Sequence, residues 1–418
     1  VWARPLRGIL SAMLRVVVFA VGVASVSGFS SPIALRHAAP QAKLSCSPRR
    51  GRAQTPSVRM GLFDNFVKAF ETSIPGNSAD LNQYEGWIER DGMKAFSFDG
   101  KQAPRPISYG SYSLAGRTAA SNTAMRESSK AQNNPFAGLP KWMQSPVASS
   151  KAPVSNKENQ DGVLQIPDVG DGVSMFCVFD GHGEYGKLVT DWAIRTLPSY
   201  IAGAVAEGRP GQLLNRITDA YRAADALLTE ELGYPVIEDS GTTCALALVK
   251  DDLLLVGGLG DSRVVLGVDT GDGSLGAQPV TLDQSPKVPA ETARIEKAGG
   301  EVRGEGVGGR VYAKGQEFPG LAVARAFGDG DAKQYGVTVD PQFIGWKLRS
   351  GQDFVLILAS DGVWNAVGNE IAVEICAKHR QTRDANKAAN ELVLKARQVW
   401  EGLAKGRIDD ISAVVVFL

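Results

Sequence analysis

The sequence places aspartates at five points where an apolar run meets a turn. They are Asp161 in "ENQDG", Asp180 in "FDGHG", Asp261 in "LGDSR", Asp361 in "ASDGVW", and Asp409 with Asp410 in "IDDIS". A single Asp-Gly corner means little, because turns use both residues routinely. Several of them would gather carboxylates in one cleft if their strands share a sheet. Clustered carboxylates repel one another, and hard divalent cations relieve that repulsion. An all-oxygen set of ligands favours Mg²⁺ or Mn²⁺ over zinc.

The corner "VFDGHG" also carries His182, which a turn does not require. This histidine is a poor candidate for a zinc ligand, because no second His or Cys accompanies it at usable spacing. The other two histidines are His37, in a basic N-terminal segment, and His379, on a predicted helix. Both are expected to be plain surface residues.

The runs around these corners predict the elements that must position them. Residues 244–268 predict three short strands, with turns at 250–252 and around 260–261, and further strands are predicted at 354–362 and 411–418. Helical patterns cover 187–207, 213–232, 291–298, 369–378 and 384–403. Strands joined by tight turns imply antiparallel pairing. We therefore predict an α+β fold in which sheet packs against sheet with helices outside.

Charge is unevenly distributed along the 418 residues. The whole chain has 45 basic and 45 acidic residues, but nine of the basic ones and none of the acidic ones precede Asp64. The remainder has 36 basic and 45 acidic residues, a net charge of −9. This acidic body argues against nucleic acid as a partner. The four cysteines form no CxxC pair, which indicates a reducing compartment without structural disulfides.

Residues 1–60 are interpreted as a targeting leader. Arg4 and Arg7 precede the apolar stretch "VVVFAVGVASVSG", and Phe29 then opens a basic, acid-free segment that extends to Arg59. The pattern resembles the bipartite leaders of algae with secondary plastids, so we expect a plastid protein. A secretory signal or a membrane anchor is the alternative. The stretch is short for a transmembrane helix, and no stable membrane insertion is expected of the mature chain.

Three further regions follow the leader. Residues 61–101 are predicted to form a short helical extension, with an amphipathic helix in "GLFDNFVKAF". Residues 102–155 are rich in Ser, Ala, Pro and Asn and predict a linker, within which "ISYGSYSLAG" could be the first strand of the domain. The alternating apolar and polar segments of residues 156–418 predict one compact domain.

Eight motifs of this domain resemble, in order, those of the protein phosphatase 2C family of metal-dependent Ser/Thr phosphatases. They are "KENQD", "VFDGHG", "DSGTTCALALV", "GLGDSRVVLG", "DQSPKVPAETARIEKAGGEV", "GLAVARAFGD", "LILASDGVWNAV" and "GRIDDISAVVVF". The opening motif is most similar to a plant and algal branch. The resemblance implies a four-layer sandwich, in which helices flank two antiparallel β-sheets and a dinuclear metal site lies at one end.

By the same resemblance, Asp180 bridges two Mg²⁺ or Mn²⁺ ions and the Gly181 carbonyl binds one of them. Asp361 and Asp409 hold the other ion, Asp161 lies in or just outside the ligand shell, and Asp261 matches a weaker third site. The implied reaction is hydrolysis of phosphoserine and phosphothreonine by a metal-activated bridging water, with His182 protonating the leaving group. For Asp261 a purely structural role in a hairpin is an equal alternative.

Three of the chain's departures from the family concern residues expected at the site. Gln160 stands where many members have an acidic residue, and Asn156 stands where many have an arginine that grips the phosphate. Lys157 is the candidate substitute for that arginine, as a point charge without a bidentate fork. Asn365 replaces a further aspartate, which puts the third-metal site in doubt.

We expect the partner to be a phosphorylated protein substrate and the chain to be a monomer. Two other functions stay open: a phosphatase fold kept as a non-catalytic binding or regulatory module, and a metal hydrolase acting on small phosphoesters.

Overall fold

The computed structural model describes residues 106–117, 158–206, 212–304, 308–403 and 408–418. The leader and the extension predicted over residues 1–101 lie outside this set, as do Asn156 and Lys157. The helices are α5 (Gly186–Ala206), α6 (Leu213–Leu232), α7 (Tyr234–Ile237), α8 (Pro289–Lys297), α9 (Gly330–Lys333), α10 (Asp361–Trp364), α11 (Asn369–Ala377) and α12 (Ala385–Leu403). The predicted helices match α5, α6, α8, α11 and α12 to within two residues at each end.

Two five-stranded antiparallel sheets form the centre of the fold. The first has the order β14 (Gln342–Lys347), β7 (Leu253–Leu259), β6 (Cys244–Lys250), β3 (Ser174–Phe179), β2 (Gly162–Ile166). The second has the order β1 (Ser108–Leu114), β16 (Ile411–Phe417), β15 (Asp353–Ala359), β8 (Arg263–Asp269), β9 (Leu275–Pro279). Two smaller sheets consist of β10 (Gly300–Arg303), β11 (Arg310–Ala313), β12 (Pro319–Leu321), and of β13 (Phe327–Gly328), β5 (Gly241–Thr242), β4 (Gly181–His182).

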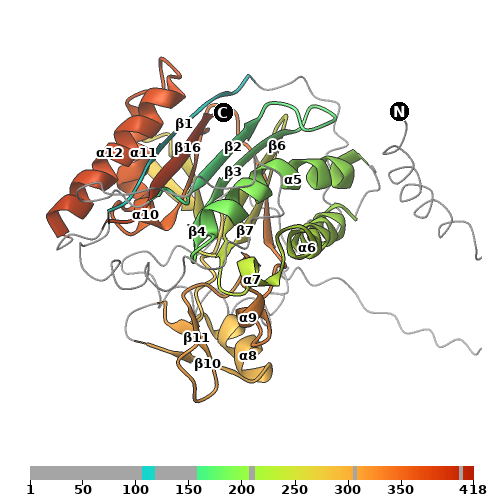
Figure 1. Cartoon of the computed structure of the whole chain (residues 1–418). Coiled ribbons are helices and arrows are strands. Elements are labelled where there is room, and N and C mark those ends of the chain that lie inside the picture. The colour runs from blue at the N-terminus through green and yellow to red at the C-terminus, as the bar shows by residue number, and fades with distance from the viewer. Residues whose placement is uncertain (1–105, 118–157, 207–211, 305–307, 404–407) are drawn as a thin grey trace, which may run out of the picture. The chain divides into compact units, whose positions relative to one another are not determined.

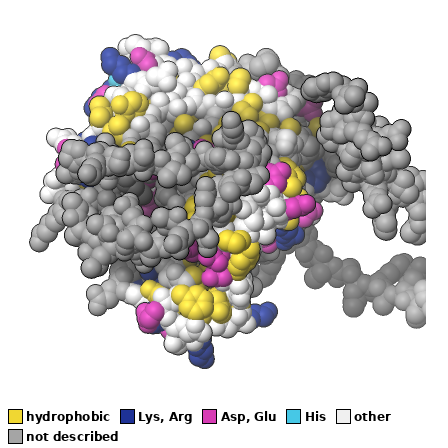
Figure 2. All heavy atoms as spheres, in the orientation of Figure 1, with side chains coloured by type: hydrophobic (Ala, Val, Ile, Leu, Met, Phe, Trp, Pro, Cys, Tyr) yellow, Lys and Arg dark blue, Asp and Glu magenta, His cyan; other side chains and the backbone are white. Residues whose placement is uncertain are grey.

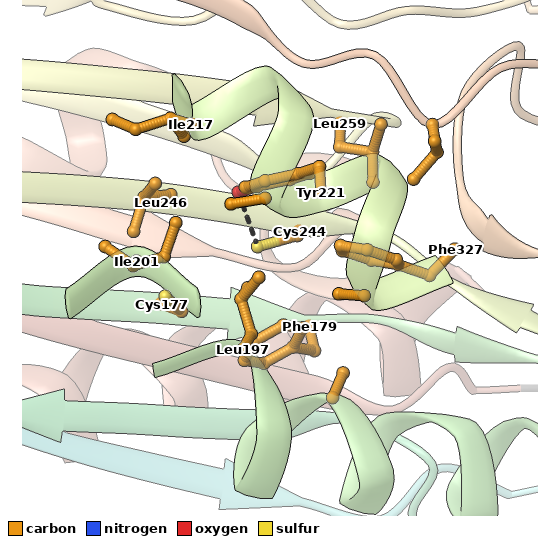
Figure 3. Packing of buried hydrophobic residues seen from close by; sticks show 14 of the residues in the cluster. Cys177, Phe179, Leu197, Ile201, Ile217, Tyr221, Cys244, Leu246, Leu259 and Phe327 are labelled. Atoms are coloured by element: carbon orange, nitrogen blue, oxygen red, sulfur yellow. Dashed lines mark hydrogen bonds between the residues drawn. The ribbon is translucent and has the colours of Figure 1, made fainter. Parts of the chain in front are cut away.

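The two large sheets pack face to face, and helices cover both outer faces (Figure 1). Strand β3 shows how the sequence specifies this arrangement, because every residue of it is buried. Phe176 and Val178 enter the core between the sheets. Met175, Cys177 and Phe179 point the other way, toward α5 and α6, where Figure 3 shows Cys177 and Phe179 beside Leu197 of α5. The predicted four-layer α+β sandwich is confirmed.

The turn predicted around residues 260–261 does not close a hairpin. Strands β6 and β7 pair as expected, but β7 and β8 belong to different sheets, so the chain crosses the sandwich at Gly260 and Asp261. The prediction was wrong because both strands are buried along nearly their whole length. Strands buried on both faces lack the polar alternation that would show which neighbour they pair with.

The stretch "ISYGSYSLAG" forms β1, which pairs with β16 over seven residues. The pairing also fixes the loop that follows α11, since Arg383 donates to the carbonyl oxygens of Pro106 and Phe417 at 2.7 and 2.8 Å. The folded unit thus includes residues that precede position 156.

His379 is not a plain surface residue. Only 8% of it is exposed, and its Nε2 lies 2.9 Å from Glu391 Oε2 of α12. The three cysteines at 177, 244 and 376 are free and buried. No helix among the described residues is long and apolar enough to span a bilayer. On the face shown in Figure 2, charged side chains of both signs alternate with apolar ones.

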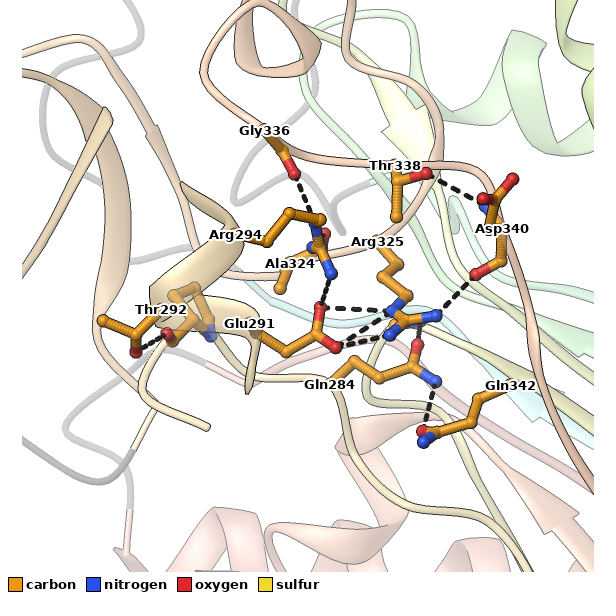
Figure 4. A network of polar contacts seen from close by, with 12 residues as sticks. Gln284, Glu291, Thr292, Arg294, Ala324, Arg325, Gly336, Thr338, Asp340 and Gln342 are labelled. Atoms are coloured by element: carbon orange, nitrogen blue, oxygen red, sulfur yellow. Dashed lines mark hydrogen bonds and ion pairs between the residues drawn. The ribbon is translucent and has the colours of Figure 1, made fainter. Parts of the chain in front are cut away.

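The lobe formed by α8, β10, β11 and β12 (residues 289–321) packs beside one end of the sandwich (Figure 1). A buried ion network connects it to the body (Figure 4). Glu291, fully buried on α8, accepts from Arg325 at 2.5 Å and from Arg294 at 2.6 Å, and Arg325 also donates to the Asp340 carbonyl at 2.8 Å. Pairing of this kind is what permits a carboxylate to be buried.

Candidate active site

The sequence-predicted aspartates lie at strand ends along one edge of the sandwich. In the first sheet, Gly162 pairs with Phe179 and Cys244 pairs with Leu259, so Asp161, Asp180 and Asp261 lie at the same edge. In the second sheet, Ala359 pairs with both Arg263 and Ala413, which places Asp361 and Asp409 at the corresponding edge. In an antiparallel sheet, alternate strands begin and end at the same edge. Each of the two packed sheets therefore contributes carboxylates to this edge from its own side.

These side chains surround a cavity of about 490 Å³. Asp180, Gly181, His182, Asp261, Asp361 and Asp409 all line it. Asp161 is buried next to it, with only 5% of its surface exposed. Its Oδ2 accepts from Ser360 Oγ at 2.8 Å, whereas its buried Oδ1 has no hydrogen-bond partner.

Burial and mutual repulsion perturb the carboxylates strongly. Burial raises the pKa of Asp180 well above its ordinary value, and Asp161, Asp361, Asp261 and Asp409 raise it further. Burial also raises the pKa of Asp161 to about 7 and that of Asp261 to about 8. Desolvated carboxylates that repel one another favour either protonation or a bound cation.

The donor set fits hard divalent cations. Its side-chain ligands would be carboxylate oxygens, and the buried Oδ1 of Asp161 has no hydrogen-bond partner. The carboxylates also lie close enough to repel one another, and a bound cation would relieve that repulsion. Gly181 is required at its position, because a Cβ there would come within 2.5 Å of both the Gln160 carbonyl and Thr190 Oγ1. Among the described residues, no three His, Cys, Asp or Glu side chains converge on one point as a ready-made site. The carboxylates line the walls of the cavity instead.

The adjacent aspartates Asp409 and Asp410 have different surroundings. Asp409 faces the cavity. Asp410 is 3% exposed and accepts from the backbone N–H groups of Gly116 at 2.6 Å and Gln160 at 3.0 Å. Asp410 therefore ties the segments after β1 and before β2 to the start of β16.

His182 has a partner that sequence reasoning missed. Its Nε2 lies 2.8 Å from Oδ2 of Asp329, a residue with only 2% of its surface exposed. Burial disfavours the imidazolium, but the charge and hydrogen bond of Asp329 outweigh that effect, and the pKa of His182 is raised. The backbone of Asp329 is left-handed, with a φ of 53°. The sequence feature that could have indicated Asp329 as a site residue is its position between two glycines in "FGDG".

Both departures within the described residues have contacts in the site. The Gln160 amide donates to the Gly183 carbonyl at 2.9 Å, next to His182. Asn365 Nδ2 donates to Asp361 Oδ2 at 3.0 Å. An ionised aspartate at position 365 could not donate this hydrogen bond to Asp361, because a carboxylate only accepts. Asn365 therefore orients the Asp361 carboxylate and adds no negative charge to the site.

Comparisons with known proteins agree with this fold and indicate the family. The family model "Protein phosphatase 2C" matches residues 150–400. The chain is 36% identical over 272 residues to "Probable protein phosphatase 2C 64" of Oryza sativa subsp. japonica, a match that covers 62% of each protein. It is 33% identical over 276 residues to "Probable protein phosphatase 2C 72" of Arabidopsis thaliana, covering 62% of this chain and 81% of the relative.

A solved structure extends the similarity to the fold. The serine-threonine phosphatase 2C of Toxoplasma gondii superposes with a TM-score of 0.54 at 27% identity, covering 62% of this chain and 90% of that one. The family match spans more than half of the 418 residues. The chain belongs to the protein phosphatase 2C family of Ser/Thr protein phosphatases.

Proposed function

We propose that this protein hydrolyses phosphoserine and phosphothreonine in proteins with Mg²⁺ or Mn²⁺ bound in the cavity. The supporting observation is that carboxylates from both sheets surround one cavity that also contains His182. Two cations would be held by Asp180, the Gly181 carbonyl, Asp361 and Asp409, with Asp161 in or next to the ligand shell. Asp261 would belong to a weaker third site.

Phosphate monoesters hydrolyse extremely slowly in water, so the reaction needs strong catalysis. Bound metal ions would provide it. When bound, they supply Lewis acidity, which lowers the pKa of a water molecule and offsets the charge of the phosphoryl group. No nucleophilic side chain of the protein is then required. The carboxylates keep the site anionic enough to retain the ions.

His182 is proposed as the general acid. The departing Ser or Thr oxygen is strongly basic and needs a proton, which an imidazolium can donate. Asp329 keeps this imidazole protonated and oriented, because its buried carboxylate lies 2.8 Å from Nε2. The Gln160 amide holds the Gly183 carbonyl and so limits movement of the turn that bears His182.

The test is turnover of a phosphothreonine peptide and of p-nitrophenyl phosphate by the full chain with Mn²⁺, with Mg²⁺ and with EDTA. Metal-dependent turnover of both would support the enzyme, and a peptide that inhibits hydrolysis of the small ester would identify protein as the preferred substrate. The neutral amides of Gln160 and Asn365 favour the second candidate, a regulatory binding module. Stoichiometric binding of a phosphoprotein without turnover at saturating Mn²⁺ would establish that alternative.

We also propose that residues 1–60 direct the protein to a plastid and that the mature protein is a monomer. The basic, acid-free composition of the leader supports the first proposal. Import of a fluorescent protein fused to residues 1–60 tests it, and secretion of the fusion would contradict it. Light scattering of the purified protein tests the second.

A further inference from the structure

A guanidinium lies at the acidic cavity, beside the histidine and the carboxylates. Among the described residues that line it, Arg310 is the only Lys or Arg, whereas Asp180, Asp261, Asp361 and Asp409 are all acidic. Arg310 is exposed and begins β11 in the 289–321 lobe, so it reaches the cavity from outside the sandwich. An exposed cation at the mouth of an anionic site is a candidate for binding an anionic substrate group.

Contacts within the lobe, and with Lys287 just before it, fix the position of Arg310. Its Nη1 donates to the Gly320 carbonyl at 2.6 Å, and Gly320 also lines the cavity. The preceding Gly308–Gly309 pair is held against Lys287, whose N–H donates to the Gly308 carbonyl at 3.1 Å. A Cβ at Gly309 would come within 2.9 Å of Lys287 Cγ, so the backbone approaches closely here.

The chemistry of the guanidinium suits a phosphoryl group. The bond to Gly320 occupies one of five N–H donors, and the planar fork can pair two others with phosphate oxygens. We propose that Arg310 binds the phosphate of the substrate and of the product, so that the lobe supplies the cationic contact of the active site. This inference rests on the proposed phosphatase function, because it places the phosphate at the carboxylate-lined cavity.

Arg303 provides a matched control. It lies directly opposite Arg310 in the β10–β11 pairing. Its guanidinium is engaged elsewhere, 2.5 Å from Glu301, 2.8 Å from Glu317 and 4.1 Å from the centre of the Tyr312 ring. Arg303 does not line the cavity, so its loss tests whether any charge change in the lobe produces the same effect.

The experiment measures the dissociation constant of inorganic phosphate from the full-length, Mn²⁺-loaded protein by calorimetry, which requires no turnover. Arg310→Gln should weaken phosphate binding by about tenfold or more, because a charge-assisted hydrogen bond is lost. Arg310→Lys, which keeps the charge without the fork, should give a smaller loss, and Arg303→Gln should match the wild type.

Phosphate affinity of Arg310→Gln within twofold of the wild type would overturn the proposal, as would a wild-type protein that binds no phosphate. A higher KM for a phosphopeptide with unchanged phosphate affinity would also overturn it, since Arg310 would then contact the peptide chain. If Arg310→Gln fails to fold, Arg310→Lys decides the question by the same measurement. Failure of the proposed function appears separately, as wild-type protein that binds phosphate without hydrolysing either ester.

Discussion

The pair formed by His182 and Asp329 leads to a prediction about which substrates depend on it. Replacing Asp329 with Asn removes the buried charge and keeps the shape. Asn also tolerates the left-handed backbone at this position, where φ is 53°. The change should therefore act on the imidazole rather than on the fold.

The size of the effect follows from the contact. A hydrogen bond to a charged group contributes about 1.5–3 kcal/mol, and one pKa unit corresponds to about 1.4 kcal/mol. His182 is 26% exposed and the amide can still accept a hydrogen bond, so the lower end of the range applies. We expect the pKa of His182 to fall by about one unit, which makes imidazolium about tenfold scarcer above that pKa.

The assay compares two leaving groups across pH. With a phosphothreonine peptide, the alkaline limb of kcat should move about one unit lower, because the leaving alkoxide needs the proton. With p-nitrophenyl phosphate, whose leaving group is weakly basic, kcat should change little. Asp331→Asn is the control. Asp331 lies two residues away, and among the described contacts its carboxylate accepts hydrogen bonds only from the exposed Tyr234 hydroxyl and the Gln334 amide. Equal losses on both substrates, or an unmoved pH profile, would refute the role assigned to Asp329.

Three further predictions concern the metals and the lobe. Asp361→Ala should lower metal-dependent kcat/KM at least about a hundredfold, because cation binding provides several kcal/mol of transition-state stabilisation; a loss below tenfold in the steady-state assay would exclude Asp361 as a ligand. Glu291→Ala should lower the free energy of unfolding by about 3–5 kcal/mol, since it leaves Arg325 without its buried partner; an unchanged urea midpoint would contradict this. Burial and neighbouring carboxylates raise the pKa of Asp161 to about 7 and of Asp261 to about 8, from 3.8. The folded state retains these protons and the unfolded state releases them, so the Tm in EDTA should fall as pH rises from about 4 to 8. A Tm that rises across that window would count against the buried carboxylates.

The positions of the site aspartates could be predicted because they depend on a simple rule. Apolar runs such as 175–179 and 354–359 predict strands, and antiparallel order brings alternate strand ends to one edge. The ordered motifs then indicate which of the many Asp-Gly corners belong together. The structure gathers Asp180, Asp261, Asp361 and Asp409 around one cavity, although no metal contact follows from the sequence alone.

Asp329 and Arg310 could not be found this way, for different reasons. Asp329 follows a strand of only two residues, so no apolar run marks it as a site position. Arg310 lies in a lobe whose strands are three or four residues long, and which reaches the cavity only through tertiary packing. The partner of β8 was predicted wrongly, because strands buried on both faces give no sign of their neighbours.

The order of the second sheet has a consequence for biosynthesis. Strand β16 lies between β1 and β15, and Ser113 of β1 meets Ser412 of β16 across 299 residues of chain. Strand β1 is among the first described residues to leave the ribosome, yet its partner is among the last. At about 5–20 residues per second, β1 waits roughly 15–60 s for that partner. The carboxylate edge of this sheet, which includes Asp409, can therefore form only after translation has passed residue 417.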